Sequence, residues 1–155
     1  MMEHEMETKH IGLIEQGTVI DHITDEKVFA ISELLKLDNV KTFVFVGAHL
    51  ISKKLNKKGL IKIENYFLSD DMIHKIALLT PEATINLIKD GKVFEKKKLV
   101  LPEMFIGIIK CNNYNCITNK EQVDTKIHVV NKMKRMFKCY HCENIMNNGE
   151  VQLVK

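Results

Sequence analysis

Four cysteines in two close pairs constrain this chain more than any other feature of its sequence. Cys111 and Cys116 are separated by four residues, and Cys139 and Cys142 by two. Each pair can form a tight turn that presents two thiolates to one ion, and the stretch between the pairs is long enough for a hairpin that brings them together. Tetrahedral zinc takes four such ligands, at about 2.3 Å for sulfur. The spacing therefore predicts one structural Zn²⁺ ion per chain.

The same cysteines admit other interpretations. Two disulfides or free thiols are one alternative, and a redox dithiol at Cys139 and Cys142 is another, although it leaves the first pair unexplained. His128 and His141 are competing ligands, but a solvated or core-edge histidine is the simpler interpretation of each. With four thiolate ligands no position stays open for water, so the ion is expected to be structural.

The composition changes near Pro102. Residues 1–102 contain 15 lysines and 15 acidic residues, whereas residues 103–155 contain eight basic residues, five acidic residues and all four cysteines. We expect an N-terminal domain over residues 1–102 and a C-terminal zinc domain over residues 103–155. The second domain is small and β-rich, and zinc binding can supply on the order of 10 kcal/mol to the folding of such a domain.

The first domain has the pattern of alternating strands and helices. We predict strands at residues 18–23, 42–46, 60–67, 83–88 and 93–96, with a polar loop at residues 53–58. Thr24 and Ser69 are the predicted N-caps of two helices, and Pro81 ends the second. Asp90 and Gly91 predict a tight hairpin. The order is that of an α+β, ferredoxin-like fold, an antiparallel sheet with both helices on one face, plus one added strand.

The sequence also limits the function classes. The polar N-terminus lacks the features of a secretory signal, and no stretch approaches the ~18 apolar residues that a membrane span needs, so we expect a cytoplasmic protein. No glycine-rich phosphate loop is present, and Asp21 beside His22 is weak evidence for an enzyme. A nucleic-acid-binding zinc ribbon is the main alternative. It is favoured by a basic run that a solvated strand face explains equally well: Lys132, Lys134, Arg135 and Lys138.

Several segments in a fixed order resemble one family. They are Gln-Gly-Thr-Val-Ile-Asp-His-Ile at residues 16–23, Leu-Ile-Lys-Ile-Glu-Asn at 60–65, a stretch ending Ala-Thr-Ile-Asn-Leu-Ile at residue 88, and the two cysteine pairs. Together, from about residue 11 to the C-terminus, they resemble the regulatory chain of aspartate carbamoyltransferase. The resemblance is weaker at residues 1–9, and this chain has Gly91 where many family members have a bulky aromatic residue nearby.

The resemblance implies a non-catalytic subunit. Family members bind nucleotides (ATP, CTP and UTP) as allosteric effectors through the N-terminal domain and dock on the catalytic chain through the zinc domain. The catalytic chain makes carbamoyl-aspartate in pyrimidine biosynthesis. Regulatory chains form homodimers, and the best-known assembly has two catalytic trimers and three regulatory dimers. The resemblance implies no nucleic-acid or membrane partner.

The resemblance also implies an effector site. Its polar members suit phosphates, ribose and the edge of a base, and its aliphatic members suit the faces of a base. For the aliphatic residues alone, ordinary sheet core is an equally good interpretation. Lys62 lies on the strand face opposite Ile61 and Ile63, so it is not explained in that way. Which of the lysines at 96–98 meets phosphate is left open. The implied residues are Leu13, Ile14, Val19, Asp21, His22, Lys62, Asn86, Ile88, Val93 and Lys96.

Overall fold

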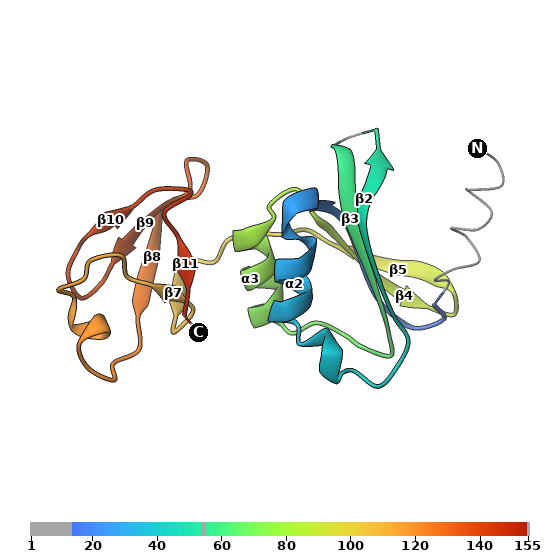
Figure 1. Cartoon of the computed structure of the whole chain (residues 1–155), viewed down its shortest axis with the longest axis horizontal. Coiled ribbons are helices and arrows are strands. Elements are labelled where there is room, and N and C mark those ends of the chain that lie inside the picture. Colours follow the sequence, from blue (N-terminus) through green and yellow to red (C-terminus); the bar gives the residue numbers. More distant parts are fainter. Residues whose placement is uncertain (1–13, 54, 155) are drawn as a thin grey trace. The chain divides into compact units, whose positions relative to one another are not determined.

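A computed structural model describes residues 14–53 and 55–154 of the chain. The chain forms two compact units and passes from the first to the second between Val100 and Leu101 (Figure 1). A five-stranded sheet and both α-helices belong to the first unit, and the second consists of short strands joined by loops.

The first unit has the predicted order of strands and helices. Its sheet is antiparallel, with strand order β2-β3-β1-β4-β5. The ferredoxin-like prediction is confirmed, and β5 is the added strand at one edge. The elements are β1 (Gly17–Thr24), η1 (Asp25–Lys27), α2 (Val28–Leu34), η2 (Leu37–Asn39), β2 (Val44–Ser52), β3 (Asn56–Glu64), α3 (Asp70–Leu79), β4 (Thr84–Lys89) and β5 (Lys92–Lys97).

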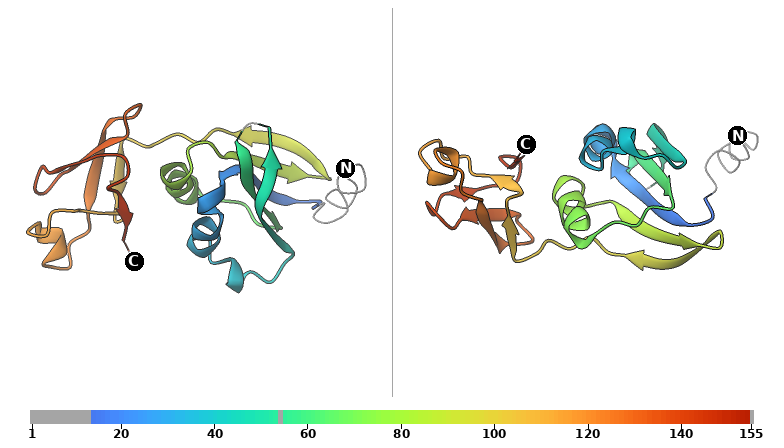
Figure 2. Two further views of the ribbon diagram at one scale, coloured as in Figure 1. Left: turned by 45° about the horizontal axis from the view of Figure 1, so that its top comes forward. Right: turned by 90° about the horizontal axis from the view of Figure 1, so that it is seen from below.

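Both helices cover the same face of this sheet (Figure 2). Ile20 in β1 is paired with Ile61 in β3 and with Ile85 in β4, and all three side chains are fully buried. They belong to a core cluster that also contains residues of α2 and α3. Burying each such side chain stabilises the fold by about 1.5–3 kcal/mol. Residues that alternate with these isoleucines point to the other side of the sheet, which we call the open face.

One predicted helix cap is confirmed and the other is wrong. The Ser69 hydroxyl accepts a hydrogen bond from the Met72 N–H at 3.3 Å, and α3 ends before Pro81 as expected. Thr24 makes no capping hydrogen bond, because its hydroxyl lies 3.2 Å from the Thr80 hydroxyl instead. A 3-10 turn therefore comes first, and the α-helix begins only at Val28.

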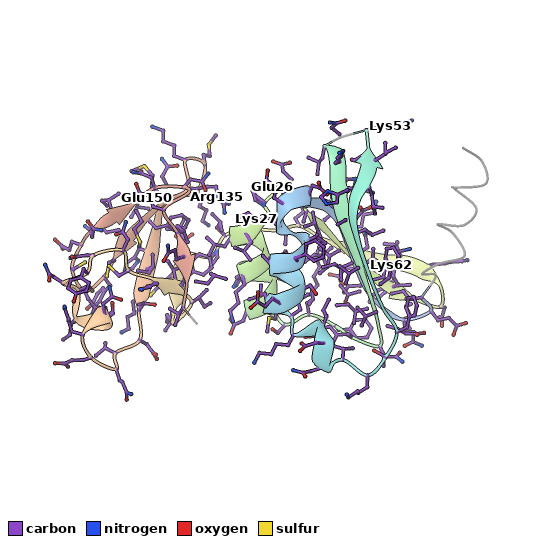
Figure 3. All side chains as sticks on the ribbon, in the orientation of Figure 1. Glu26, Lys27, Lys53, Lys62, Arg135 and Glu150 are labelled. Atoms are coloured by element: carbon purple, nitrogen blue, oxygen red, sulfur yellow. The ribbon has the colours of Figure 1, made fainter. Side chains whose placement is uncertain are left out.

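The predicted loop at residues 53–58 is also wrong. β3 begins at Asn56, and Lys57 and Lys58 are paired with Ile51 and Leu50 of β2. Strand pairing depends on backbone groups, so a run of lysines can continue a hairpin where the side chains reach solvent or a carboxylate. The tip of this hairpin lies near Lys53, labelled in Figure 3. The Asp90-Gly91 hairpin is confirmed, with φ of 54° and 74° at its two turn residues.

The second unit is small and β-rich, as predicted. Its strands form one sheet of order β10-β9-β8-β6 and a two-stranded β11-β7 sheet. The rings of Phe105 and Phe137 meet edge to face in its core, with centroids 6.5 Å apart. The elements are β6 (Met104–Ile106), β7 (Ile109–Lys110), η3 (Ile117–Asn119), β8 (Lys126–Asn131), β9 (Met136–Cys139), β10 (Ile145–Met146) and β11 (Gln152–Leu153).

In the part of the chain that the structure describes, neither α-helix has the length and apolar character that crossing a membrane requires.

Candidate metal centre and open sheet face

The four cysteines of the second unit converge on one point. Their sulfur atoms all lie within 4.8 Å of one another. The Sγ atoms of Cys111 and Cys142 are 3.6 Å apart, and those of Cys116 and Cys139 are 3.8 Å apart. A disulfide needs about 2.05 Å, and none of the four residues forms one. The cysteines are therefore grouped as one cluster of thiols rather than as two cross-links.

The spacing of the sulfur atoms fits a tetrahedral metal ion. With metal–sulfur bonds of about 2.3 Å, the corners of a tetrahedron lie about 3.8 Å apart. The Sγ separations of 3.6 and 3.8 Å agree with that value, and the other pairs lie within 4.8 Å. Thiolates also suit zinc chemically, since soft sulfur ligands in a tetrahedral set are typical of its structural sites. The four cysteines can therefore supply a complete set of four sulfur ligands to one ion.

Two loops present the thiols. The first runs from Cys111 to Cys116, where the Cys116 N–H donates to the Asn113 carbonyl oxygen at 3.0 Å. The second follows β9, where the Cys139 N–H donates to the Asn144 oxygen at 3.0 Å. The Asn144 side-chain amide also donates to the Asn112 side-chain oxygen, which ties the two loops together. Hydrogen bonds within and between the loops thus bring all four sulfur atoms to one centre.

The thiols differ in their proton affinity. Burial raises the pKa of both Cys111 and Cys139. Burial acts in the same direction on Cys142, but hydrogen bonds from the Asn113 side chain and the Asn144 backbone outweigh it and lower the pKa of Cys142 to about 7. A divalent cation offsets the cost of placing several thiolates together, because a coordinated thiol loses its proton outright. Metal binding should therefore release protons.

The two histidines that could compete as ligands are used elsewhere. His141 Nε2 lies 3.3 Å from the Asp124 carbonyl oxygen, and the His128 ring packs near Tyr140 with centroids 6.2 Å apart. Neither is among the residues whose donor atoms converge. The four cysteines alone define the candidate metal centre among the described residues.

Part of the basic run in this unit is already engaged. Lys132 Nζ lies 2.8 Å from a Glu103 carboxylate oxygen. The Arg135 guanidinium donates to the Asn148 side-chain oxygen at 3.2 Å, and burial lowers its pKa. Two of the four cations are therefore held within the domain, which weakens the case for a nucleic-acid surface.

On the first unit, four residues of the predicted effector site form one row across the open face. Val19 in β1 is paired with Lys62 in β3 and with Asn86 in β4, and Asn86 is paired with Lys96 in β5. Directly paired residues point to the same side of a sheet. Figure 3 labels Lys62 on the side away from α2 and α3. Antiparallel pairing thus gathers four residues that lie far apart in the sequence.

A β-bulge brings the acidic and imidazole groups to this row. The pairing of β1 with β3 shifts between Ile20 and Ile23, and His22 has a φ of 55°. His22 Nδ1 lies 3.2 Å from the Thr84 hydroxyl and 3.9 Å from an Asp21 oxygen. Asp21 in turn accepts from Lys58 Nζ at 2.6 Å. The bulge thereby concentrates polar side chains at one end of the open face.

Among the described residues, two partly buried groups in the row lack a partner of their own. The Asn86 side-chain oxygen is buried and has no hydrogen-bond partner among the described residues. Burial and the neighbouring Lys58 cation lower the pKa of Lys62, while Asp21 opposes them. Within residues 14–53 and 55–154 Lys62 forms no ion pair. A ligand with an anionic group and a hydrogen-bond donor would complement both residues.

The remaining predicted site residues have mixed positions. Ile14 and Ile88 are buried, yet neither belongs to the core cluster beneath the helices. Val93 is paired with Ile88 and is half-exposed, and Lys96 is exposed. Leu13 lies outside the described residues. Ile14, Ile88 and Val93 are therefore not explained by the helix-side core, which was the competing interpretation for them.

Sequence reasoning missed Lys58, which it placed in a loop. The alternation of Lys58, Leu60 and Lys62 could have shown that all three point to one face of β3. It also missed Thr84, which meets His22, and Thr118 and Asn119, which contact the metal loops. Polar residues like these give no signal in a single sequence, because many of them face solvent.

The fold and the two sites define a class of protein: a ferredoxin-like domain with a polar, cationic open face, followed by a small domain built around four thiols. Comparison with known families agrees with this. Residues 9–100 match the model of the aspartate carbamoyltransferase regulatory chain, allosteric domain, and residues 103–152 match that of the same chain's metal binding domain.

Individual relatives span nearly the whole chain. An aspartate carbamoyltransferase regulatory chain from Bacteroides thetaiotaomicron is 38% identical over 153 residues, covering 99% of this chain and all of the relative. Those from Pyrococcus horikoshii and Pyrococcus abyssi are 42% and 41% identical over 143 residues, covering 91% of this chain and 94% of each relative. The chain belongs to the aspartate carbamoyltransferase regulatory chain family, whose members are the non-catalytic subunit of that enzyme.

Proposed function

We propose that this chain binds nucleoside triphosphates on its open face and transmits their effect to aspartate carbamoyltransferase catalytic chains in de novo pyrimidine biosynthesis. CTP and UTP lower the activity of the complex, and ATP raises it. One Zn²⁺ ion per chain stabilises the second unit, which docks on the catalytic chain. The chain works in the cytoplasm as a homodimer, within an assembly of two catalytic trimers and three regulatory dimers.

The observation that best supports nucleotide binding is the row of Lys62, Val19, Asn86 and Lys96 across four strands. Lys62 and Lys96 supply positive charge for phosphates. The Asn86 oxygen, which has no partner among the described residues, can accept a hydrogen bond from a ribose hydroxyl or a base amine. Leu13, Ile14, Val19, Ile88 and Val93 provide apolar surface for the faces of a base. Asp21 and His22 provide further polar contacts at the bulge.

A single site of this kind can accept both the pyrimidine and the purine nucleotides. Phosphate contacts are common to CTP, UTP and ATP, so the cations supply affinity and not discrimination. Discrimination has to come from contacts at the base. Opposite effects then require that each nucleotide binds one quaternary state better than the other, since equal binding shifts nothing. Couplings of this kind are typically about 1–3 kcal/mol, and they are reciprocal.

Zinc has a structural role in this proposal. When bound, the ion supplies cross-links between the Cys111–Cys116 loop and the turn that contains Cys139 and Cys142. The four cysteines and the ion together fix the shape of the second unit, whose own apolar core is small. The second unit then acts as a rigid docking module. Removal of the metal should therefore separate the regulatory chain from the catalytic chain.

Co-purification tests the docking role. The chain and the catalytic chain from the same genome are expressed together, and the product is sized and its zinc content measured. We expect a large complex with one zinc per regulatory chain. A catalytic trimer that elutes alone, beside a metal-loaded regulatory chain, would contradict the docking role.

Calorimetric titration of the assembled complex with CTP tests the open face. We expect Lys62→Ala to weaken CTP binding by at least about tenfold, because a charge-assisted contact is typically worth about 1.5–3 kcal/mol. Lys27→Ala is the matched control, since Lys27 is an exposed lysine of η1 and both residues are labelled in Figure 3. Equal CTP affinity in the two variants would remove Lys62 from the site.

A further inference from the structure

The short helix η3 lies directly after the first cysteine pair and holds the loop between these cysteines. The Asn119 side-chain Nδ2 donates to two carbonyl oxygens of that loop, Cys111 O at 2.9 Å and Asn113 O at 2.8 Å. An amide group has two N–H donors, so one Asn119 side chain satisfies both acceptors. The Asn119 backbone N–H also donates to Cys116 O at 2.9 Å. Asn119 therefore contacts the loop at its start, middle and end.

The two cysteine loops differ in how much support they need. The Cys139–Cys142 turn is short and closes through backbone hydrogen bonds, with the Glu143 N–H donating to Cys139 O at 2.9 Å. The Cys111–Cys116 loop is longer, so more conformational entropy is lost when its two sulfur atoms are fixed. A side chain that ties two points of the longer loop, Cys111 O and Asn113 O, lowers this loss at the moment when metal binds.

A neighbouring residue contacts one of the sulfur atoms. The Thr118 hydroxyl lies 3.1 Å from Cys116 Sγ and can donate a hydrogen bond to it. A thiolate is a better acceptor than a thiol, so this bond strengthens when Cys116 is a metal ligand. Thr118 and Asn119 are adjacent on η3, and one contacts the ligand atom while the other contacts the ligand's backbone.

We propose that Asn119 is a positioning residue of the metal site, which sets Cys111 and Cys116 in tetrahedral geometry before the ion binds, and that Thr118 stabilises the Cys116 thiolate. This inference rests on the proposed zinc site. Groups that orient metal ligands from outside the coordination sphere typically change metal affinity by about 10–100-fold when they are removed. Neither residue is itself among the converging metal-ligand candidates.

Metal release from the full chain tests the role of Asn119. Asn119→Ala removes the side chain, and Asn119→Asp keeps its shape but cannot donate when ionised. Each variant is loaded with Zn²⁺ and mixed with a chelator whose colour reports the metal. We expect both to release zinc at least about tenfold faster than the unaltered chain.

Asn115 provides matched controls within the same loop. It is exposed, and no hydrogen bond of its side chain is found among the described residues. Asn115→Ala and Asn115→Asp make the same chemical changes, so they account for the effect of a new charge near the metal. Release from the Asn119 variants at the rate of these controls would overturn the proposal. If Asn119→Ala fails to fold, the zinc release rate of the near-isosteric Asn119→Asp variant still tests the positioning role of Asn119. An unaltered chain that binds no zinc would instead overturn the metal assignment itself.

A spectrum separates the two roles. In the Co²⁺-loaded chain, charge transfer from thiolate to metal gives an absorption band whose energy depends on hydrogen bonds to sulfur. We expect Thr118→Val to shift this band to longer wavelength and Thr118→Ser to restore it, while the Asn119 variants bind Co²⁺ more weakly with the band unmoved. A Thr118→Val band at the unaltered position would show that the hydroxyl does not act on the bound thiolate.

Discussion

Lys58 Nζ lies 2.6 Å from Asp21 Oδ1, and this contact joins β3 to β1 beside the bulge at His22. The Lys58 side chain is 20% exposed and that of Asp21 24%, so the pair is well shielded from solvent. Because Asp21 also favours the charged form of Lys62, one carboxylate organises two lysines of the open face. Asp21 thus reduces the repulsion between Lys58 and Lys62 while the open face keeps its positive charge.

Asp21→Asn should destabilise the first unit by about 1–2 kcal/mol, a value between those of exposed and fully buried ion pairs, because it leaves a partly shielded lysine without its counter-charge. The chain contains no Trp, so urea unfolding is followed by the helical circular dichroism signal, and both α-helices belong to the first unit. Lys62→Ala should cost less, since Lys62 has no ion partner to lose among the residues that the structure describes. A larger loss of unfolding free energy for Lys62→Ala than for Asp21→Asn would contradict the role given to Asp21 among these lysines.

Ile61→Ala should cost about 2–5 kcal/mol, because Ile61 is fully buried beneath the helices and the shorter side chain leaves a cavity. Ile51→Ala is the matched control, since the Ile51 side chain is 91% exposed. It should change the free energy of unfolding by less than about 0.5 kcal/mol. If urea unfolding shows similar losses of unfolding free energy for the two variants, the assignment of the two sheet faces is wrong.

The Asp25–His49 pair predicts a pH-dependent contribution to stability. Burial acts to raise the pKa of Asp25, but hydrogen bonds from the His49 side chain and backbone outweigh it, so this pKa lies below its ordinary value of 3.8. A depressed carboxyl pKa stabilises the fold above the unfolded pKa, and that contribution is lost as the pH falls through the folded pKa. The stability difference between the unaltered chain and Asp25→Asn should therefore hold above the ordinary value of 3.8 and shrink as the pH falls below it, through the folded pKa. A difference that stays constant or grows in acid would be inconsistent with this pair.

Much of the fold could be predicted because its signals are local. Alternation in β3, the Ser69 cap and the Asp90-Gly91 turn depend on neighbouring residues, and all three are found. The start of β3 was missed because Lys57 and Lys58 are strand residues only by virtue of their pairing with β2. Thr24 failed as a cap for a similar reason, since a hydroxyl contact with Thr80, distant in sequence, replaces the local one.

The two candidate sites also differ in how far local sequence signals could predict them. Cysteine spacing was enough to group the four thiols, because few chemistries use two such pairs. Sequence alone could not show that Lys62, Val19, Asn86 and Lys96 share one row, since their register depends on four strands. Nor could it show that Asn119 holds the first cysteine loop, because a single asparagine after a cysteine has no distinctive pattern.

Removal of the metal should separate the complex before it affects the first unit. Treating the assembled complex with a strong chelator should release free catalytic trimers, as seen by sizing, while the helical signal of the first unit persists. Added Zn²⁺ should then restore the large complex. A complex that stays intact after all zinc has left would show that the metal is not needed for docking.

Aspartate saturation curves of the assembled complex test the central claim most directly. We predict that CTP shifts the curve to higher aspartate concentration and ATP to lower, and that Lys62→Ala reduces both shifts while Lys27→Ala keeps them. Curves that coincide with and without each nucleotide, in a complex of the expected size and zinc content, would contradict the regulatory role proposed for the open face.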